Sequence, residues 1–215
     1  MRIGVDEAGK GPVLGPMVAA AVRADPETLP EGIADSKRLS PARREELAAE
    51  LRARDDISVG VAFVEPETID DPETGMNLLT VRAQVEAAAE VAVDADELVC
   101  DAGDVSESRF GRRVRDGVAE SGADVEVHAQ HRADDEHAIV GAASIVAKVE
   151  RDRRVDAIAD EYGEVGSGYP SDQTTRDFLR GFVREHGILP DCARKSWSTC
   201  ADLLAAHEQA SLGDF

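Results

Sequence analysis

Short apolar runs alternate with amphipathic stretches along this chain, and their spacing predicts both strands and helices. Two runs, 1–5 and 17–23, lie on either side of a turn rich in glycine and proline, which predicts an antiparallel pair of strands. Strict alternation of apolar and polar residues over 57–63 predicts a half-buried strand. Short apolar runs at 97–100 and 125–128 predict two further strands.

Helices are predicted where apolar residues recur every three or four positions. Serine followed by proline at Ser40 is a typical helix start, and we expect Ser171 to cap a later helix that ends at Gly187. Leu78 and Val81 are expected to face the core from another helix. The predicted helices cover 40–54, 77–93, 106–118, a stretch from 138 onward, 171–187 and 198–207. This order predicts an α/β fold, a mixed central sheet flanked by helices, with a helical C-terminal part.

Composition adds a strong acidic bias. The chain has 44 Asp and Glu residues against 24 Lys and Arg, a net charge of −20, and its lysines are Lys10, Lys37, Lys148 and Lys195. A protein that works in molar salt has this composition, because the Debye length there falls to about 3 Å and self-repulsion is screened. We therefore predict a halophilic protein; the alternative is an ordinary acidic, soluble surface.

Several classes of protein are excluded by what the chain lacks. No apolar run approaches the roughly 18 residues of a membrane-spanning helix, and no secretory signal begins the sequence. Three cysteines without a C-x-x-C pair favour a reduced compartment over a disulfide framework or a zinc site. We expect a cytoplasmic monomer with one domain over 1–207 and a C-terminal tail over 208–215.

Four acidic residues stand at the predicted ends of secondary-structure elements. Asp6 and Glu7 are adjacent, so both reach one site only if the strand ends there and the following glycines supply a turn. Asp101 ends the strand over 97–100, and Asp134 precedes a helix. Four such carboxylates could bind two hard cations about 3.5–4 Å apart, the arrangement for attack on a phosphodiester. In so acidic a chain, however, carboxylates alone are weak evidence.

Six segments in order make the evidence much stronger. Together they resemble the ribonuclease HII family in its archaeal form, and they occupy 6–16, 35–37, 100–104, 131–134, 143–152 and 166–172. The resemblance implies a ribonuclease H-like fold in which Asp6, Glu7, Asp101 and Asp134 are the catalytic, metal-binding carboxylates. The implied cofactors are two divalent ions, Mg²⁺ or Mn²⁺.

The resemblance also implies a substrate site. Backbone of Gly9-Lys10-Gly11 would contact the 2′-hydroxyl of a ribonucleotide, because glycine allows close approach and this hydroxyl distinguishes RNA from DNA. Tyr169 would pack against the ribonucleotide. The nucleic-acid path would be lined by Ser36, Lys37, Ser144 and Lys148.

The implied substrates are RNA–DNA hybrids and duplex DNA that contains ribonucleotides. Cleavage would fall on the 5′ side of the ribonucleotide and leave 3′-hydroxyl and 5′-phosphate ends. Two alternatives remain open: another two-metal nuclease of the same fold, such as a junction resolvase, and a non-catalytic adaptor that binds nucleic acid or the replication clamp.

The last residues form a separate motif. Gln209, Leu212 and Phe215 lie three apart, which resembles the peptide that binds the sliding clamp of replication. Such a peptide seats apolar side chains of one helical turn in a pocket. The motif lacks a second terminal aromatic residue, and the alternative is a frayed polar tail.

Overall fold

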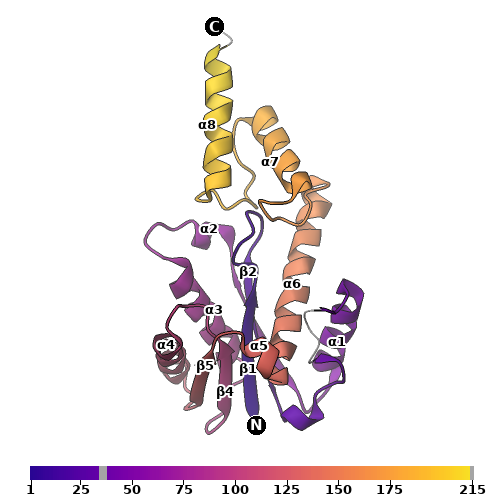
Figure 1. The fold of residues 1–215 in the computed structure, drawn as a ribbon, viewed down its shortest axis with the longest axis vertical. Coiled ribbons are helices and arrows are strands. Elements are labelled where there is room, and N and C mark those ends of the chain that lie inside the picture. The colour runs from indigo at the N-terminus through magenta and orange to yellow at the C-terminus, as the bar shows by residue number, and fades with distance from the viewer. Residues whose placement is uncertain (34–37, 214–215) are drawn as a thin grey trace. The chain divides into compact units, whose positions relative to one another are not determined.

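The computed structural model describes residues 1–33 and 38–213, with side chains described through Gln209. The chain divides into two compact units, the first built from 1–8, 18–63 and 75–150 and the second from 9–17, 64–74 and 151–215. The predicted boundary between 207 and 208 stays a prediction. In chain order the elements are β1 (Arg2–Ala8), β2 (Met17–Ala24), the 3₁₀ helix η1 (Pro26–Thr28), α1 (Pro41–Ala53), β3 (Ser58–Val64), α2 (Pro66–Ile69), α3 (Met76–Ala89), β4 (Glu97–Asp101), α4 (Glu107–Glu120), β5 (Glu126–Gln130), α5 (Ala133–Glu136), α6 (Ala138–Tyr162), α7 (Gln173–His186) and α8 (Ser198–Gly213) (Figure 1).

A five-stranded mixed sheet in the order β3-β2-β1-β4-β5 forms the centre of the first unit. β2 runs antiparallel to β1, as the apolar runs predicted, whereas β4 is parallel to β1 and β5 is parallel to β4. The predicted fold class is therefore confirmed. Because β1, β4 and β5 are parallel, their carboxyl ends lie at the same edge of the sheet, and residues that end these strands are brought close together.

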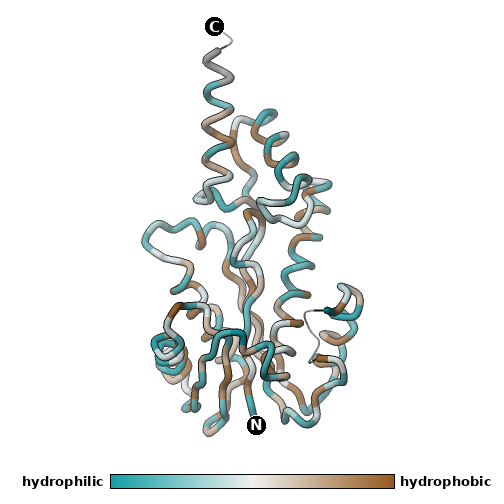
Figure 2. The backbone as a smooth tube through the Cα atoms, in the orientation of Figure 1, coloured by the Kyte–Doolittle hydropathy of each residue, from teal (hydrophilic) through white to brown (hydrophobic). Residues whose placement is uncertain are grey.

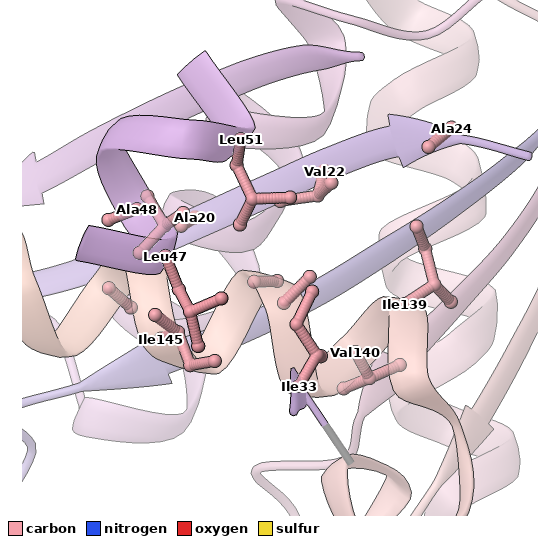
Figure 3. Packing of buried hydrophobic residues seen from close by; sticks show 14 of the residues in the cluster. Ala20, Val22, Ala24, Ile33, Leu47, Ala48, Leu51, Ile139, Val140 and Ile145 are labelled. Atoms are coloured by element: carbon pink, nitrogen blue, oxygen red, sulfur yellow. The ribbon is translucent and has the colours of Figure 1, made fainter. Parts of the chain in front are cut away.

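The main core of this unit lies between the sheet and the helices α1 and α6. Leu47 and Leu51 of α1 and Val22 of β2 are fully buried there, together with Ile145 of α6 (Figure 3). α3 and α4 cover the other face of the sheet (Figure 1). Hydropathy follows this arrangement, since the strands carry apolar stretches whereas α4 is largely hydrophilic (Figure 2).

Helix and sheet approach each other very closely at Gly4, in the first unit. A Cβ atom added to this residue would lie 2.2 Å from the backbone oxygen of Ile139 at the start of α6. Any side chain would therefore force the helix away from β1. Glycine at position 4 therefore allows α6 to pack directly against the backbone of β1, two residues before Asp6.

The second unit has its own core around α7. Leu179 and Val183 of α7 are buried with Val13, Leu14 and Cys200. Tyr162 makes an edge-on contact with Phe178, whose ring centroid lies 5.9 Å away. None of the described helices is long and apolar enough to cross a bilayer.

Several local predictions were wrong in detail. β1 continues to Ala8 instead of ending before the acids, and Leu78 is 37% exposed instead of facing the core. Asp172, not Ser171, caps α7 by accepting a hydrogen bond from the Thr174 N–H, because the Ser171 position precedes the helix by one residue more. α8 runs beyond His207 to Gly213, and the short helix α2 had no predicted counterpart.

Replacing Gly4 with Ala is expected to destabilise the protein by about 3 kcal/mol, the upper range for overpacking a close helix–sheet contact. Gly181→Ala is the matched control, since Gly181 lies in α7 with no atom near its Cβ position, and alanine favours the helix. Denaturant unfolding in molar salt measures both. Equal stability of Gly4→Ala and the unchanged chain would contradict the packing described for Gly4.

Candidate active site

The four predicted catalytic acids all belong to the first unit. β1 and β4 are parallel with Val5 opposite Cys100, so the next residues along the two strands are Asp6 and Asp101. Asp134 lies in α5, the short helix that follows β5. The topology of the sheet thus delivers all of these residues to the edge at which the three parallel strands end.

Asp6 and Glu7 reach this edge in a way the sequence did not predict. Since β1 continues through both residues, their side chains alternate between the two faces of the sheet. Asp6 is 6% exposed and lies beside Ser144 of α6, whereas Glu7 contacts Gln84 of α3. The two acids are therefore part of β1 itself, one on each face of the sheet, and no turn separates them from the strand.

Gln84 joins Glu7 to Asp101. Its Nε2 atom donates to Glu7 Oε2 at 2.6 Å and to the backbone oxygen of Asp101 at 3.0 Å, and the residue is fully buried. Sequence reasoning missed Gln84. The sequence did contain a signal for it, because Gln84 is an amide on the otherwise mostly apolar buried face of α3. A buried amide needs specific hydrogen-bond partners.

Asp101 in turn anchors the segment that carries Asp134. Its Oδ1 atom accepts a hydrogen bond at 3.0 Å from the backbone N–H of Ala133, the first residue of α5. Arg132, which precedes this helix, adopts the left-handed conformation with φ 59°. The chain therefore turns sharply after β5 and begins α5 against the end of β4. Asp134 directly follows Ala133, the residue whose N–H binds Asp101.

Electrostatics at this edge disfavour the charged form of Asp6. Burial raises the pKa of Asp6 well above its ordinary value, and the neighbouring carboxylates of Glu7 and Asp101 raise it further. The backbone N–H of Glu7, which donates to Asp6 Oδ1 at 2.7 Å, and the nearby Ser144 hydroxyl oppose this rise. Asp6 therefore lies close enough to Glu7 and Asp101 to be repelled by both carboxylates.

Ser144 and Lys148 lie one helical turn apart on α6, so they share a face of that helix. Ser144 is 1% exposed, and its hydroxyl has no hydrogen-bond partner of good geometry among the described residues. Lys148 is half-buried. Ser36 and Lys37, also predicted to line the substrate path, lie outside the described residues.

The predicted sugar-contacting loop and Tyr169 lie together in the second unit. Gly9 has φ 87°, and a Cβ atom on it would lie 2.9 Å from the backbone oxygen of Pro16, so this position requires glycine. Tyr169 is the nearest side chain to Gly11, at 3.8 Å from its Cβ position. The Arg151 guanidinium lies over the Tyr169 ring, 5.3 Å from its centroid.

The C-terminal motif is described only in part. Gln209 is exposed on α8, and Leu212 lies in the same helix without a described side chain. Phe215 lies outside the described residues. In the part of the chain that the structure describes, no group of three or more His, Cys, Asp or Glu side chains is arranged so that it could hold a metal ion.

Comparison with known proteins identifies the family. The family model for ribonuclease HII matches residues 3–200. A ribonuclease HII of Halobacterium salinarum is 59% identical over 215 residues, which is 100% of this chain and 99% of that protein.

Two solved structures agree. The crystal structure of ribonuclease H2 from Pyrococcus horikoshii OT3 has a TM-score of 0.87 at 35% identity and covers 96% of this chain and 98% of its own. The ribonuclease HII in the PCNA complex from Archaeoglobus fulgidus has a TM-score of 0.83 at 36% identity, covering 94% and 96%. The chain therefore belongs to the ribonuclease HII family and is a hydrolytic ribonuclease.

Proposed function

We propose that this chain hydrolyses the RNA strand of RNA–DNA hybrids and cuts on the 5′ side of ribonucleotides embedded in duplex DNA. The products would carry 3′-hydroxyl and 5′-phosphate ends. The observation that carries this proposal is the concentration of carboxylates at the carboxyl ends of β1 and β4, where Asp6 is buried beside Glu7 and Asp101. Family membership supplies the substrate class.

A divalent cation fits the donor set at this edge. The raised pKa of Asp6 reflects burial and the nearby charges of Glu7 and Asp101, and a bound cation would offset this repulsion. Carboxylate oxygens are the ligands that Mg²⁺ and Mn²⁺ prefer. We infer that Asp6, Glu7, Asp101 and Asp134 together hold two such ions. When bound, the ions would supply an activated water and stabilise charge on the leaving 3′-oxygen.

The chain's own groups would orient these ligands. Gln84 holds Glu7 through Oε2 and so fixes the orientation of that carboxylate. The Ala133 N–H holds Asp101 through Oδ1 in the same way. Such outer contacts fix the direction of ligand oxygens and are as much part of a metal site as the ligands themselves.

Recognition of the ribonucleotide would fall to the second unit. Gly9-Lys10-Gly11 would contact the 2′-hydroxyl through the backbone, and Tyr169 would pack against the sugar, supported by Arg151 on its other side. Ser36, Lys37, Ser144 and Lys148 would line the path of the nucleic acid. Three of the four lysines, Lys10, Lys37 and Lys148, lie in these segments, which favours phosphate contact in a chain that otherwise avoids lysine.

Two further proposals concern the setting of the enzyme. The excess of 44 acidic over 24 basic residues and the haloarchaeal relative support function in molar salt. We further propose that the enzyme is a cytoplasmic monomer. The solved complex of an archaeal ribonuclease HII with PCNA supports clamp binding. We assign this binding to the tail over 208–215, through Gln209, Leu212 and Phe215, because of their spacing. Residues 1–207 would then form the catalytic domain.

Asp101→Asn tests the metal role. Asparagine keeps an oxygen for the Ala133 N–H, so the fold is expected to persist, while cleavage with Mg²⁺ or Mn²⁺ falls at least about 100-fold, the upper range for the loss of an outer-shell metal partner. Asp135→Asn is the control, because Asp135 is exposed and paired with Arg132. Circular dichroism monitors the fold. Activity of Asp101→Asn equal to the control would refute the assignment.

Asp6→Asn is expected to stabilise the protein without divalent metal. Because folding raises the pKa of Asp6, the folded state binds more protons than the unfolded state above about pH 4, and stability falls as the pH rises through the two values. At pH 7 the variant should melt at least about 2–4 °C higher, the shift produced by 1 kcal/mol in a chain of this size. The gain should shrink below pH 4. A lower melting temperature at pH 7 would contradict the repulsion inferred here.

Deletion of Leu212 to Phe215 tests clamp binding. Removing both apolar anchors is expected to weaken binding to an archaeal clamp at least about tenfold, equivalent to 1.4 kcal/mol. Cleavage of a short duplex without the clamp should stay unchanged. Asp214→Asn in the full chain is the matched control for charge in the tail. Equal clamp affinity of the deletion variant and the full chain would favour a frayed polar tail.

A further inference from the structure

A buried arginine, Arg194, binds the backbone of the predicted sugar-contacting loop, Gly9-Lys10-Gly11. Arg194 is fully buried, and its guanidinium donates to the backbone oxygens of Gly9 at 2.6 Å, Lys10 at 2.9 Å and Gly15 at 3.0 Å. Burial, with a smaller effect of Arg151, lowers the pKa of Arg194 to about 10, so the side chain is still charged at neutral pH. A buried cation is thus devoted to the main chain of one short loop.

These contacts fix the orientation of two consecutive peptide groups. Cis peptide bonds are absent from the described residues, and in a trans peptide the carbonyl and the following N–H point in opposite directions. Since the Gly9 and Lys10 oxygens point toward Arg194, the N–H groups of Lys10 and Gly11 point away from it. Successive N–H groups on one side of a loop form a concavity suited to hydroxyl, phosphate or other oxygen ligands.

Trp197 extends this arrangement to the third residue of the loop. Its Nε1 atom donates to the Gly11 oxygen at 3.4 Å, and the Arg194 guanidinium lies 5.2 Å from the centre of its ring. All three carbonyls of Gly9-Lys10-Gly11 are therefore held by one stacked pair of side chains.

The rest of the loop is held by backbone on two sides. Leu14 pairs with Ala193 in an isolated bridge, and the Arg194 N–H donates to the Val13 oxygen at 2.8 Å. Gly168, directly before Tyr169, accepts from the Val13 N–H at 2.8 Å. Glycine at positions 9 and 11 would otherwise allow many loop conformations. The loop is thus prepared in one conformation before any ligand arrives, which lowers the entropy cost of binding.

We propose that Arg194, together with Trp197, is a positioning residue for ribonucleotide discrimination: it orients the Gly9-Lys10-Gly11 peptide groups that contact the sugar. This inference rests on the proposed function, because it assumes that the loop contacts the 2′-hydroxyl. A planar guanidinium suits the task, since its fixed fork of donors defines directions that the single ammonium group of lysine does not.

A purely structural role makes a different prediction. If Arg194 only stabilised the fold, a variant would contain less active enzyme, and every substrate would be cleaved more slowly by the same factor. If Arg194 positions the loop, a variant should instead lose part of its preference for a substrate that carries the 2′-hydroxyl. The ratio of Ki for a duplex without the ribonucleotide to KM for the duplex with it separates the two roles, because neither constant depends on the fraction of enzyme that is active.

The experiment measures KM for duplex DNA with a single ribonucleotide, and Ki for the same duplex without it as a competitor in the same reaction. In Arg194→Lys the ratio of Ki to KM is expected to fall about tenfold, the effect of losing a hydrogen bond to a charged group. In Trp197→Phe, which keeps an aromatic ring but not the indole N–H, the ratio should fall about threefold, the effect of losing a weaker neutral hydrogen bond. Arg180→Lys, at an exposed ion pair on α7, is the control and should keep the ratio.

The outcomes are distinct. A reduced ratio in either variant with an unchanged control supports the proposal, and Trp197→Phe alone decides if Arg194→Lys does not fold. A lower kcat with an unchanged ratio in the folded variants overturns the positioning role while leaving the proposed function intact. If the unchanged chain fails to cleave the ribonucleotide-containing duplex, the proposed function itself fails, and this inference fails with it.

Discussion

Like charges held close together are the constraint on which the first unit depends. Asp6 is buried beside Glu7 and Asp101, which raises its pKa, and the fold nevertheless keeps these carboxylates at one edge of the sheet. Parallel pairing of β1 with β4 brings the acids together, and the bare backbone at Gly4 lets α6 close over β1. Stability given up at a functional site in this way is common.

Each unit uses a buried polar side chain to fix a functional element. In the first, Gln84 joins Glu7 to the backbone of Asp101. In the second, Arg194 holds the carbonyls of the loop over 9–15. Both contacts span long stretches of sequence and satisfy donors that would be costly to bury unpaired. The chemistry and the substrate recognition proposed for this chain would thus depend on buried groups behind the residues that act.

Much of the fold could be predicted from local pattern. The antiparallel pair of β1 and β2 followed from two apolar runs around a glycine-rich turn, and α1 from its serine cap. The continuation of β1 through Asp6 and Glu7 could not be predicted locally. It depends on polar partners from other elements, Ser144 of α6 and Gln84 of α3. Leu78 was misplaced because the short apolar spacing of α3 fits two adjacent helix faces.

The candidate site was predictable as a set of acids but not as a geometry. Asp101 could be named from its position at a strand end and Asp134 from its position before a helix. The hydrogen bond from the Ala133 N–H that links them depends on the left-handed turn at Arg132. Arg194 and Trp197 lie in a segment whose partners are almost the whole chain away, so no local pattern indicates their role. Family resemblance, not periodicity, supplied the substrate.

The most direct test of the central claim is to map cleavage of duplex DNA that contains one ribonucleotide, in molar potassium chloride, with and without Mg²⁺ or Mn²⁺. The account predicts a single metal-dependent cut on the 5′ side of the ribonucleotide, with 3′-hydroxyl and 5′-phosphate ends. Cleavage of all-DNA junctions instead, or no cleavage with either metal, would contradict it.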